Sequence, residues 1–242
     1  VHVVDVNAER AEAAAQEIRD EAGLATAHAV DCSKAEAVEA LAEAVYAKDG
    51  RVDVLCNNAG IGHAGAIEET TREDWERVLS INLWGVIHGI TAFVPRMLRQ
   101  GGEAHIVNTA SVLGLIAAPG MAPYCASKFA VVGISECLAA ELAPRGIGVT
   151  ALCPGVIHTN IVKEASLRGD YAAKQSEVAD FYATKGASPE EVARDALAAV
   201  RGRKVIAPSP PRQVLPPWLL KRLSLPAYQL VMRYAHKKIV GP

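Results

Sequence analysis

The sequence predicts an α/β fold in which a parallel β-sheet is covered by helices on both faces. Short apolar segments with the features of buried strands alternate with longer segments of helical pattern, which is typical of βαβ units. Half of the residues are hydrophobic but only 5% are aromatic, as expected where aliphatic helices cover a parallel sheet. The 242 residues favour one domain with a large core.

Local signals place each element in order along the chain. The first helix is rich in Ala and Glu and is expected to end before Gly23. Thr71 and Asp74 have the spacing of a capping box and introduce a long helix. Ser188 followed by Pro189 marks the start of the last helix of the alternating series. The expected strands cover residues 1–5, 25–30, 52–56, 105–109, 148–153 and 204–207, and the expected helices cover residues 8–22, 35–48, 75–99, 124–142 and 189–201.

The most informative motif is the pair formed by Tyr124 and Lys128, which share one face of the expected helix because they are four residues apart. A phenol titrates near pH ~10, so it exchanges protons at neutral pH only if its phenolate is stabilised. A lysine ammonium one turn away can provide that stabilisation. Ser111, just after an apolar strand, adds a hydroxyl that could polarise a carbonyl. Taken alone, the pair is better explained as a core residue and a surface residue, so it needs support from the rest of the chain.

That support comes from further motifs, in an order that makes the chain resemble the short-chain dehydrogenase/reductase family up to about residue 200. The segment Asn57-Asn58-Ala59-Gly60 is similar to the family's NNAG turn, and Asn82 to its helix asparagine. Pro154-Gly155 with Thr159 is similar to its PG turn and following threonine. Ser111, Tyr124 and Lys128 match its serine and YxxxK pair. The resemblance implies a Rossmann-like, doubly wound parallel sheet.

The resemblance also implies an oxidoreductase that transfers a hydride between a nicotinamide cofactor and a secondary alcohol or ketone. Tyr124 would exchange a proton with the substrate, and Ser111 would hold the substrate oxygen. Lys128 would bind the nicotinamide ribose and lower the pKa of Tyr124, while Asn82 would anchor a water for proton relay. The residues expected in the cofactor cleft are Asp5, Asp31, Asn58, Ala59, Gly60, Tyr124, Lys128, Pro154, Gly155 and Thr159.

Simpler roles stay open for several of these residues. Asp31, which would meet the adenine edge, can instead cap the helix that follows Lys34. Asn82 can serve only helix packing, and Ser111 can be a turn residue at the end of a strand. A catalytically silent, dinucleotide-responsive binding protein is the alternative to an enzyme, because a fold alone does not establish turnover.

Asp5 indicates both the cofactor and a departure from the family. In a dinucleotide-binding fold, a glycine-rich phosphate loop follows the first strand, and an acidic residue about 20 positions later binds the ribose hydroxyls. Asp5 ends the strand at residues 1–5 and fits that acidic residue. No Arg or Lys lies at positions 1–9, so NAD is favoured over NADP. Only four residues precede Asp5, so we expect the family's first strand and glycine loop to be missing, which leaves a gap in the sheet.

The C-terminal segment has a different character from the rest of the chain. Residues 196–242 contain nine basic residues and no acidic one, although the net charge of the chain is −2. Prolines after Ala207 end the sheet, so we expect a domain at 1–207 and a basic, helical extension at 208–242. The extension can pack over the substrate pocket or against another subunit. Alternatively, residues 212–242 can lie on an anionic membrane surface, which would favour an apolar substrate.

Other features exclude further classes of protein. The basic residues are confined to one end of the chain, which argues against nucleic-acid binding. Five cysteines without CxxC spacing indicate buried thiols in a reducing cytoplasm. The histidines show no metal-ligand spacing, so no metal is expected. No uninterrupted apolar run reaches the ~18 residues of a membrane span. The family resemblance implies a homodimer or homotetramer.

Overall fold

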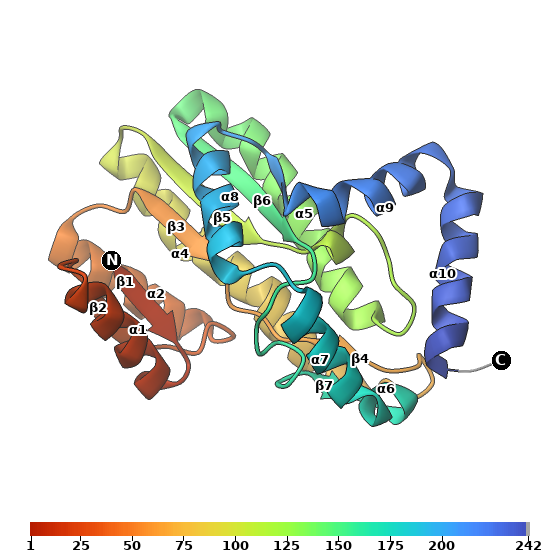
Figure 1. Ribbon diagram of the computed structural model, residues 1–242. Helices are drawn as coiled ribbons and strands as arrows, with labels where there is room; N and C mark the ends of the chain where they lie inside the picture. The colour runs from red at the N-terminus through yellow and green to blue at the C-terminus, as the bar shows by residue number, and fades with distance from the viewer. Residues whose placement is uncertain (241–242) are drawn as a thin grey trace.

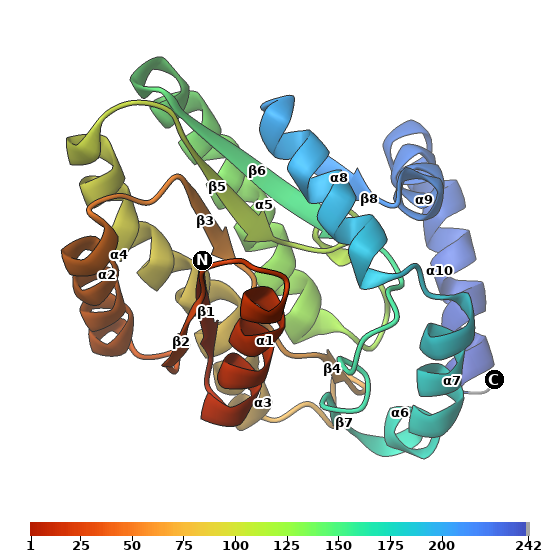
Figure 2. The ribbon, with the colours of Figure 1, turned by 60° about the vertical axis from the view of Figure 1, so that its left-hand side comes forward.

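The computed structural model describes residues 1–240 and shows parallel strands between two layers of helices (Figures 1 and 2). The helices α2, α4 and α5 pack on one face of the strands, and α1 and α8 lie on the other (Figure 2). Every predicted strand is present, with ends within two residues of those expected. The strands of the main fold are β1 (His2–Asp5), β2 (Thr26–Ala29), β3 (Val54–Asn57), β5 (Ala104–Thr109), β6 (Ile147–Pro154) and β8 (Ile206–Ser209).

These strands form two separate parallel sheets. One contains β1 and β2, and the other has the order β3-β5-β6-β8. The interruption lies between β1 and β3, where the sequence predicts a gap. Val4 of β1 and Val54 of β3 are 40% and 47% exposed, which is unusual for apolar side chains on parallel strands.

The helices follow the predicted order over the alternating part of the chain, and the one expected at residues 75–99 is assigned as two, α3 and α4. Helix α1 ends two residues before the expected position, because Ala22 adopts a left-handed conformation (φ 62°) and the Gly23 N–H donates to the Ile18 carbonyl. The helices of the main fold are α1 (Ala8–Asp20), α2 (Ala35–Asp49), α3 (Arg72–Leu79), α4 (Gly85–Gln100), α5 (Ala122–Leu142) and α8 (Pro189–Arg201).

The long helix expected at residues 75–99 begins earlier and is not uniform. The capping box at Thr71 is confirmed, since its hydroxyl accepts from the Asp74 N–H and the Asp74 carboxylate accepts from the Thr71 N–H. A π-helical turn, Ser80–Trp84, joins α3 to α4. By length and composition the whole helix, Arg72–Gln100, could cross a membrane. Its Phe93 and Met97 are buried in the core against α2 and the sheet.

Two smaller units flank the carboxyl edge of the sheet. The segment after β6, residues 157–185, contains the short strand β7 (Ser166–Leu167) and the helices α6 (Gly169–Ala173) and α7 (Gln175–Lys185), and it is called the lid below. Strand β7 pairs in parallel with β4 (His63–Ala64), which lies in the loop after β3. The lid is therefore tied to that loop by backbone hydrogen bonds.

The C-terminal extension is helical, as predicted. It consists of α9 (Pro211–Leu223) and α10 (Leu225–Val240), and α10 descends toward α6 in Figure 1. The last strand, β8, continues to Ser209, two residues beyond the expected boundary at 207. Residues 241–242 of the expected extension lie outside the described residues.

Candidate active site

The residues expected to carry the chemistry lie at the carboxyl edge of the four-stranded sheet. In register, Asn57 of β3 pairs with Asn108 of β5, and Thr109 pairs with Leu152 of β6. The carboxyl ends of these parallel strands therefore meet at one edge, where ligands bind in open α/β sheets. Ser111 follows β5 directly, and the first turn of α5 carries Tyr124 beside it.

Tyr124 is buried and its phenol hydrogen-bonds to the Ser111 hydroxyl. Burial raises the pKa of Tyr124 to about 12, and the bond from Ser111 opposes that rise. The phenol of Tyr182, on α7 of the lid, is near enough to raise the Tyr124 pKa further. At neutral pH the phenol in this ligand-free site is therefore protonated.

Lys128 lies one turn further along α5 and is almost completely buried. Its ammonium donates to the Thr109 carbonyl (2.8 Å) and lies 5.7 Å from the centre of the Tyr124 ring. Burial lowers the pKa of Lys128 to about 8. In the ligand-free site, burial dominates the pKa of Tyr124, and the lowering of that pKa by Lys128 stays a prediction.

Asn82 is fully buried within the π-helical turn and faces the same site. Its amide oxygen accepts from the Ile61 N–H (2.8 Å), and its amide nitrogen donates to the Ile61 carbonyl (3.0 Å). The amide nitrogen also donates to Ser127 Oγ on α5 (3.3 Å). A Cβ placed on Gly60 would lie 3.3 Å from Asn82 Oδ1 and 3.4 Å from Lys128 Nζ. The structure thus brings the NNAG turn, Asn82 and Lys128 together.

The remaining cofactor candidates occupy the same edge but are not all in contact. The Asn58 side chain accepts from the Thr109 hydroxyl (2.9 Å), which links the ends of β3 and β5. Pro154 ends β6, and the Gly155 N–H donates to the Ser209 carbonyl of β8 (2.8 Å). Thr159 is exposed at the start of the lid, and Ala59 is exposed beside Gly60.

Asp5 and Asp31 lie on the separate β1–β2 sheet. Asp5 ends β1, and its carboxylate accepts from the Asn7 N–H (2.8 Å). The Asp31 carboxylate accepts from the Ser33 N–H (2.9 Å), which lowers its pKa, whereas the N-cap position of α2 is Lys34. Asp31 therefore shapes the turn before α2 and does not cap that helix.

The residues around Lys128 fit the ribose of a nicotinamide cofactor. A buried ammonium has three N–H donors, and its described bond to Thr109 uses one of them. Gly60 leaves room beside Lys128 and Asn82 that a side chain would fill. The hydroxyl oxygens of a ribose could accept hydrogen bonds from the Lys128 ammonium, which would compensate for its burial.

The lid is anchored by a cluster that the sequence did not reveal. Asp74 is buried, and its carboxylate accepts two bonds from Arg168 (2.9 and 3.0 Å) and one from the Ser166 hydroxyl (3.0 Å). The Arg168 guanidinium holds the pKa of Asp74 well below its usual range. His63 lies beside this pair, with Nδ1 4.0 Å from Asp74 Oδ1. Only the capping-box spacing of Asp74 was visible in the sequence, because Arg168 is far away along the chain.

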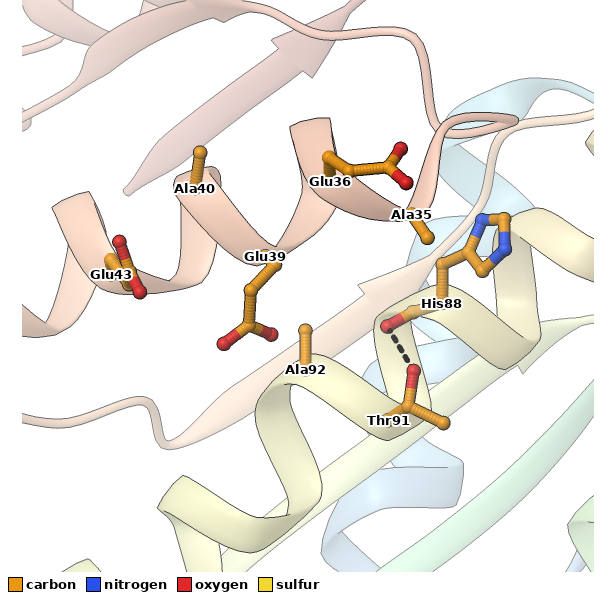
Figure 3. Close-up of a pocket in the computed structure, with 8 residues that line it drawn as sticks. All are labelled: Ala35, Glu36, Glu39, Ala40, Glu43, His88, Thr91 and Ala92. Carbon is orange, nitrogen blue, oxygen red and sulfur yellow. Dashed lines mark hydrogen bonds between the residues drawn. The ribbon is translucent and has the colours of Figure 1, made fainter.

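A cavity of about 410 Å³ lies elsewhere, between α2 and α4 (Figure 3). Glu36, Glu39 and Glu43 line it from α2, and His88 and Thr91 line it from α4. None of the predicted site residues belongs to its lining, so it is separate from the chemistry at Tyr124. Among the described residues, no group of three His, Cys, Asp or Glu side chains is arranged to hold a metal ion.

Comparison with known proteins agrees with this geometry. The family model described as short chain dehydrogenase matches residues 1–169. "Probable oxidoreductase EphD" from Mycobacterium tuberculosis is 37% identical over 215 residues, covering 86% of this chain and 36% of that protein. "D-threitol dehydrogenase" from Mycolicibacterium smegmatis is 40% identical over 199 residues, covering 81% of this chain and 74% of the relative. This chain therefore spans about a third of the first relative's length.

Solved structures show the same fold. A short-chain dehydrogenase/reductase from Burkholderia phymatum in complex with NAD superposes with a TM-score of 0.87 at 30% identity, over 93% of this chain and 85% of that one. A gluconate 5-dehydrogenase from Burkholderia cenocepacia in complex with NADP and tartrate gives a TM-score of 0.72 at 26% identity, over 86% and 82%. The chain belongs to the short-chain dehydrogenase family, an oxidoreductase class that uses nicotinamide cofactors.

Proposed function

We propose that this protein is an NAD-dependent oxidoreductase that interconverts a secondary alcohol and a ketone. The observation that carries the proposal is one buried group of side chains at the carboxyl edge of the sheet, in which Tyr124 contacts Ser111 and lies beside Lys128, and Asn82 is bonded to Ser127 of the same helix. Its members are Asn82, Ser111, Tyr124 and Lys128. A protein that only binds a dinucleotide does not need all four of them.

In the proposed reaction, Tyr124 moves the proton and Ser111 orients the substrate. The protonated phenol can deliver its proton to a carbonyl oxygen that the Ser111 hydroxyl holds in place. In the oxidative direction the same oxygen takes the alcohol proton back. The nicotinamide ring, when bound, supplies the hydride acceptor or donor.

Lys128 and Asn82 support these steps from within the protein. Lys128 would bind the ribose hydroxyls and stabilise negative charge that develops on Tyr124. Asn82 holds Ile61 and Ser127 with its amide, and we propose that it also anchors a water that relays the proton.

The proposed preference for NAD rests on Asp5. A carboxylate at the end of β1 can accept from both ribose hydroxyls and repels the additional phosphate of NADP. Arg10, on the first turn of α1, is paired with Glu164 of the lid (3.0 Å). Asp31, Asn58, Ala59, Pro154, Gly155 and Thr159 are proposed to line the rest of the cofactor site.

Replacing Tyr124 with Phe tests the proposal. We expect the variant to lose about 10²- to 10⁴-fold in kcat with a panel of secondary alcohols and ketones, because the proton donor is gone. Its affinity for NADH, measured by fluorescence titration beside NADPH, should stay within about twofold of wild type, since Lys128 and Gly60 remain. Tyr46→Phe, which removes a phenol bound to Gln100 on the α2 side, is the matched control.

Each outcome of this experiment has a clear meaning. A Tyr124→Phe variant that retains turnover would refute the assignment of Tyr124. Wild-type protein that binds NADH but turns over no substrate of the panel would support the silent binding protein instead. Tighter binding of NADPH than of NADH would contradict the role of Asp5.

We also propose that the protein assembles into a homodimer or homotetramer and that it is located in the cytoplasm.

We further propose that residues 212–242 contact anionic membranes. On α9 and α10, Leu223 and Leu230 are 84% and 69% exposed. Exposed basic residues lie beside them, and the extension carries no acidic residue. Exposed apolar side chains among cations fit a lipid surface of negative charge. An apolar alcohol or ketone would then be the substrate.

A further inference from the structure

The C-terminal helices hold the loop that connects the two ends of the candidate active site. This loop, residues 115–120, begins shortly after Ser111 and leads into α5, which carries Tyr124. The Ala117 N–H donates to the Tyr228 hydroxyl (2.8 Å), and that hydroxyl in turn donates to the Ala117 carbonyl. One buried phenol of α10 thus satisfies both backbone groups of a loop residue 111 positions away.

A second contact of the extension acts on the same loop. Lys221 of α9 donates to the Leu115 carbonyl (2.8 Å), and its ammonium lies 4.5 Å from the centre of the Phe129 ring on α5. The loop is therefore held at two points, two residues apart, by two different helices of the extension. Ala117 is itself exposed, so the bonds to Tyr228 are what fixes its backbone.

The extension also reaches the lid. The His236 ring of α10 lies within hydrogen-bonding distance of the Tyr171 hydroxyl on α6 (3.3 Å). Tyr171 packs directly on Gly120, because a Cβ on that glycine (φ 76°) would lie 2.1 Å from its hydroxyl. The Gly120 carbonyl also accepts from the Gly65 N–H (2.8 Å), in the loop after β4. Loop 115–120, the lid and α10 are therefore connected by direct contacts.

We infer that Tyr228 is a positioning residue that fixes loop 115–120 and thereby sets the shape of the substrate side of the site. The inference rests on the proposed function of the Ser111–Tyr124 pair. The described hydrogen bonds of the Tyr228 hydroxyl go to the Ala117 backbone, so Tyr228 acts through that loop residue. Its effect is on how the substrate is held, whereas binding of the nicotinamide cofactor does not depend on it.

The test is Tyr228→Phe, which removes the hydroxyl and keeps the ring. Hydrogen exchange measured by mass spectrometry should show loop 115–120 exchanging about tenfold faster, because the Ala117 amide has lost its acceptor. KM for a carbonyl substrate should rise about fivefold, while kcat changes less than twofold and NADH affinity stays unchanged. Lys221→Met, which frees Leu115, should loosen the same loop. Tyr46→Phe, which removes a partly buried phenol bond far from the loop, should leave exchange at 115–120 unchanged.

The exchange measurement needs no substrate, so it is independent of the proposed function. Faster exchange together with the rise in KM supports the inference. Unchanged exchange in Tyr228→Phe, or an equal effect of Tyr46→Phe, overturns it. Faster exchange with an unchanged KM for a substrate that the wild type turns over would also overturn it, since the loop would then not shape the site. If the wild type turns over no carbonyl, the proposed function fails while faster exchange still supports the hold on the loop.

Discussion

Burial of Lys128 should make the ligand-free protein less stable than it would be with an apolar residue at this position. Burial lowers the pKa of Lys128 from 10.5 to about 8. In the folded state this group therefore binds fewer protons than in the unfolded state between those two pH values. The sign follows from linkage: the unfavourable contribution is fully present below pH ~8 and shrinks as the pH rises toward ~10.5. At its full extent it amounts to about 3 kcal/mol.

Lys128→Met tests this loss of stability, because methionine keeps a long flexible side chain without the charge. Methionine relieves the desolvation but leaves the Thr109 carbonyl without its donor, which costs about 1 kcal/mol. We expect the variant to be about 2 kcal/mol more stable than wild type at pH 7. This difference in the free energy of unfolding should narrow by about 1 kcal/mol between pH 7 and pH 9. Over this range Lys128 of the folded wild type loses its proton, whereas the cost of the lost hydrogen bond in the variant stays the same.

The assay is urea unfolding of both proteins without cofactor at pH 7, 8 and 9, with the free energies of unfolding compared at each pH. The comparison isolates Lys128, because the other titrating groups are present in both chains. Lys185→Met, at an exposed position near the end of α7, should change the free energy of unfolding by less than about 0.5 kcal/mol. If the difference in the free energy of unfolding between Lys128→Met and wild type stays constant or widens between pH 7 and pH 9, burial of Lys128 does not destabilise the fold.

Two other predictions concern the lid and the extension. Asp74→Asn should cost about 2 kcal/mol in urea unfolding at pH 7, since Arg168 and Ser166 lose a charged carboxylate as their acceptor. The cost should be complete above pH ~4, the unfolded-state pKa, and should shrink progressively as the pH falls below it toward the depressed pKa of the folded state. The double substitution Leu230→Glu and Arg233→Glu on α10, which removes an apolar side chain and reverses a charge, should abolish co-sedimentation with phosphatidylserine vesicles. Val178→Glu on the lid should not. Equal sedimentation of the reversed variant and wild type would argue against membrane contact.

Much of the fold could be predicted because its signals are local. The strands of the main sheet are short apolar runs, and the capping box at Thr71 lies within four residues, so sequence alone located them. The end of α1 was misplaced because Ala22 takes a left-handed conformation that is more typical of glycine. The π-helical turn at Ser80–Trp84 was also missed, because the bonds that hold Asn82 there come from Ile61 and Ser127.

The candidate site likewise has features that follow from local sequence and features that depend on tertiary packing. Tyr124 and Lys128 are one helical turn apart, so their shared face followed from spacing. Their electrostatics did not, because the pKa of each depends on how far the surrounding chain excludes water. Burial raises the pKa of the Tyr124 phenol in the ligand-free site, an effect that the spacing of the two residues could not predict. A sequence motif specifies which groups meet, but burial determines their protonation.

The two sides of the site therefore depend on different kinds of information. The chemical side uses residues that local motifs bring together at the carboxyl edge of the sheet. The proposed substrate side is built from contacts between distant positions, such as Ser166 with Asp74, 92 residues apart, and Tyr228 with Ala117, 111 residues apart. Such contacts can change through substitutions in the lid or the extension without altering Ser111, Tyr124 or Lys128. Relatives that share the motif can then keep one reaction and differ in substrate, so the identity of the substrate is to be sought in α6, α7 and α10 and not in the motif.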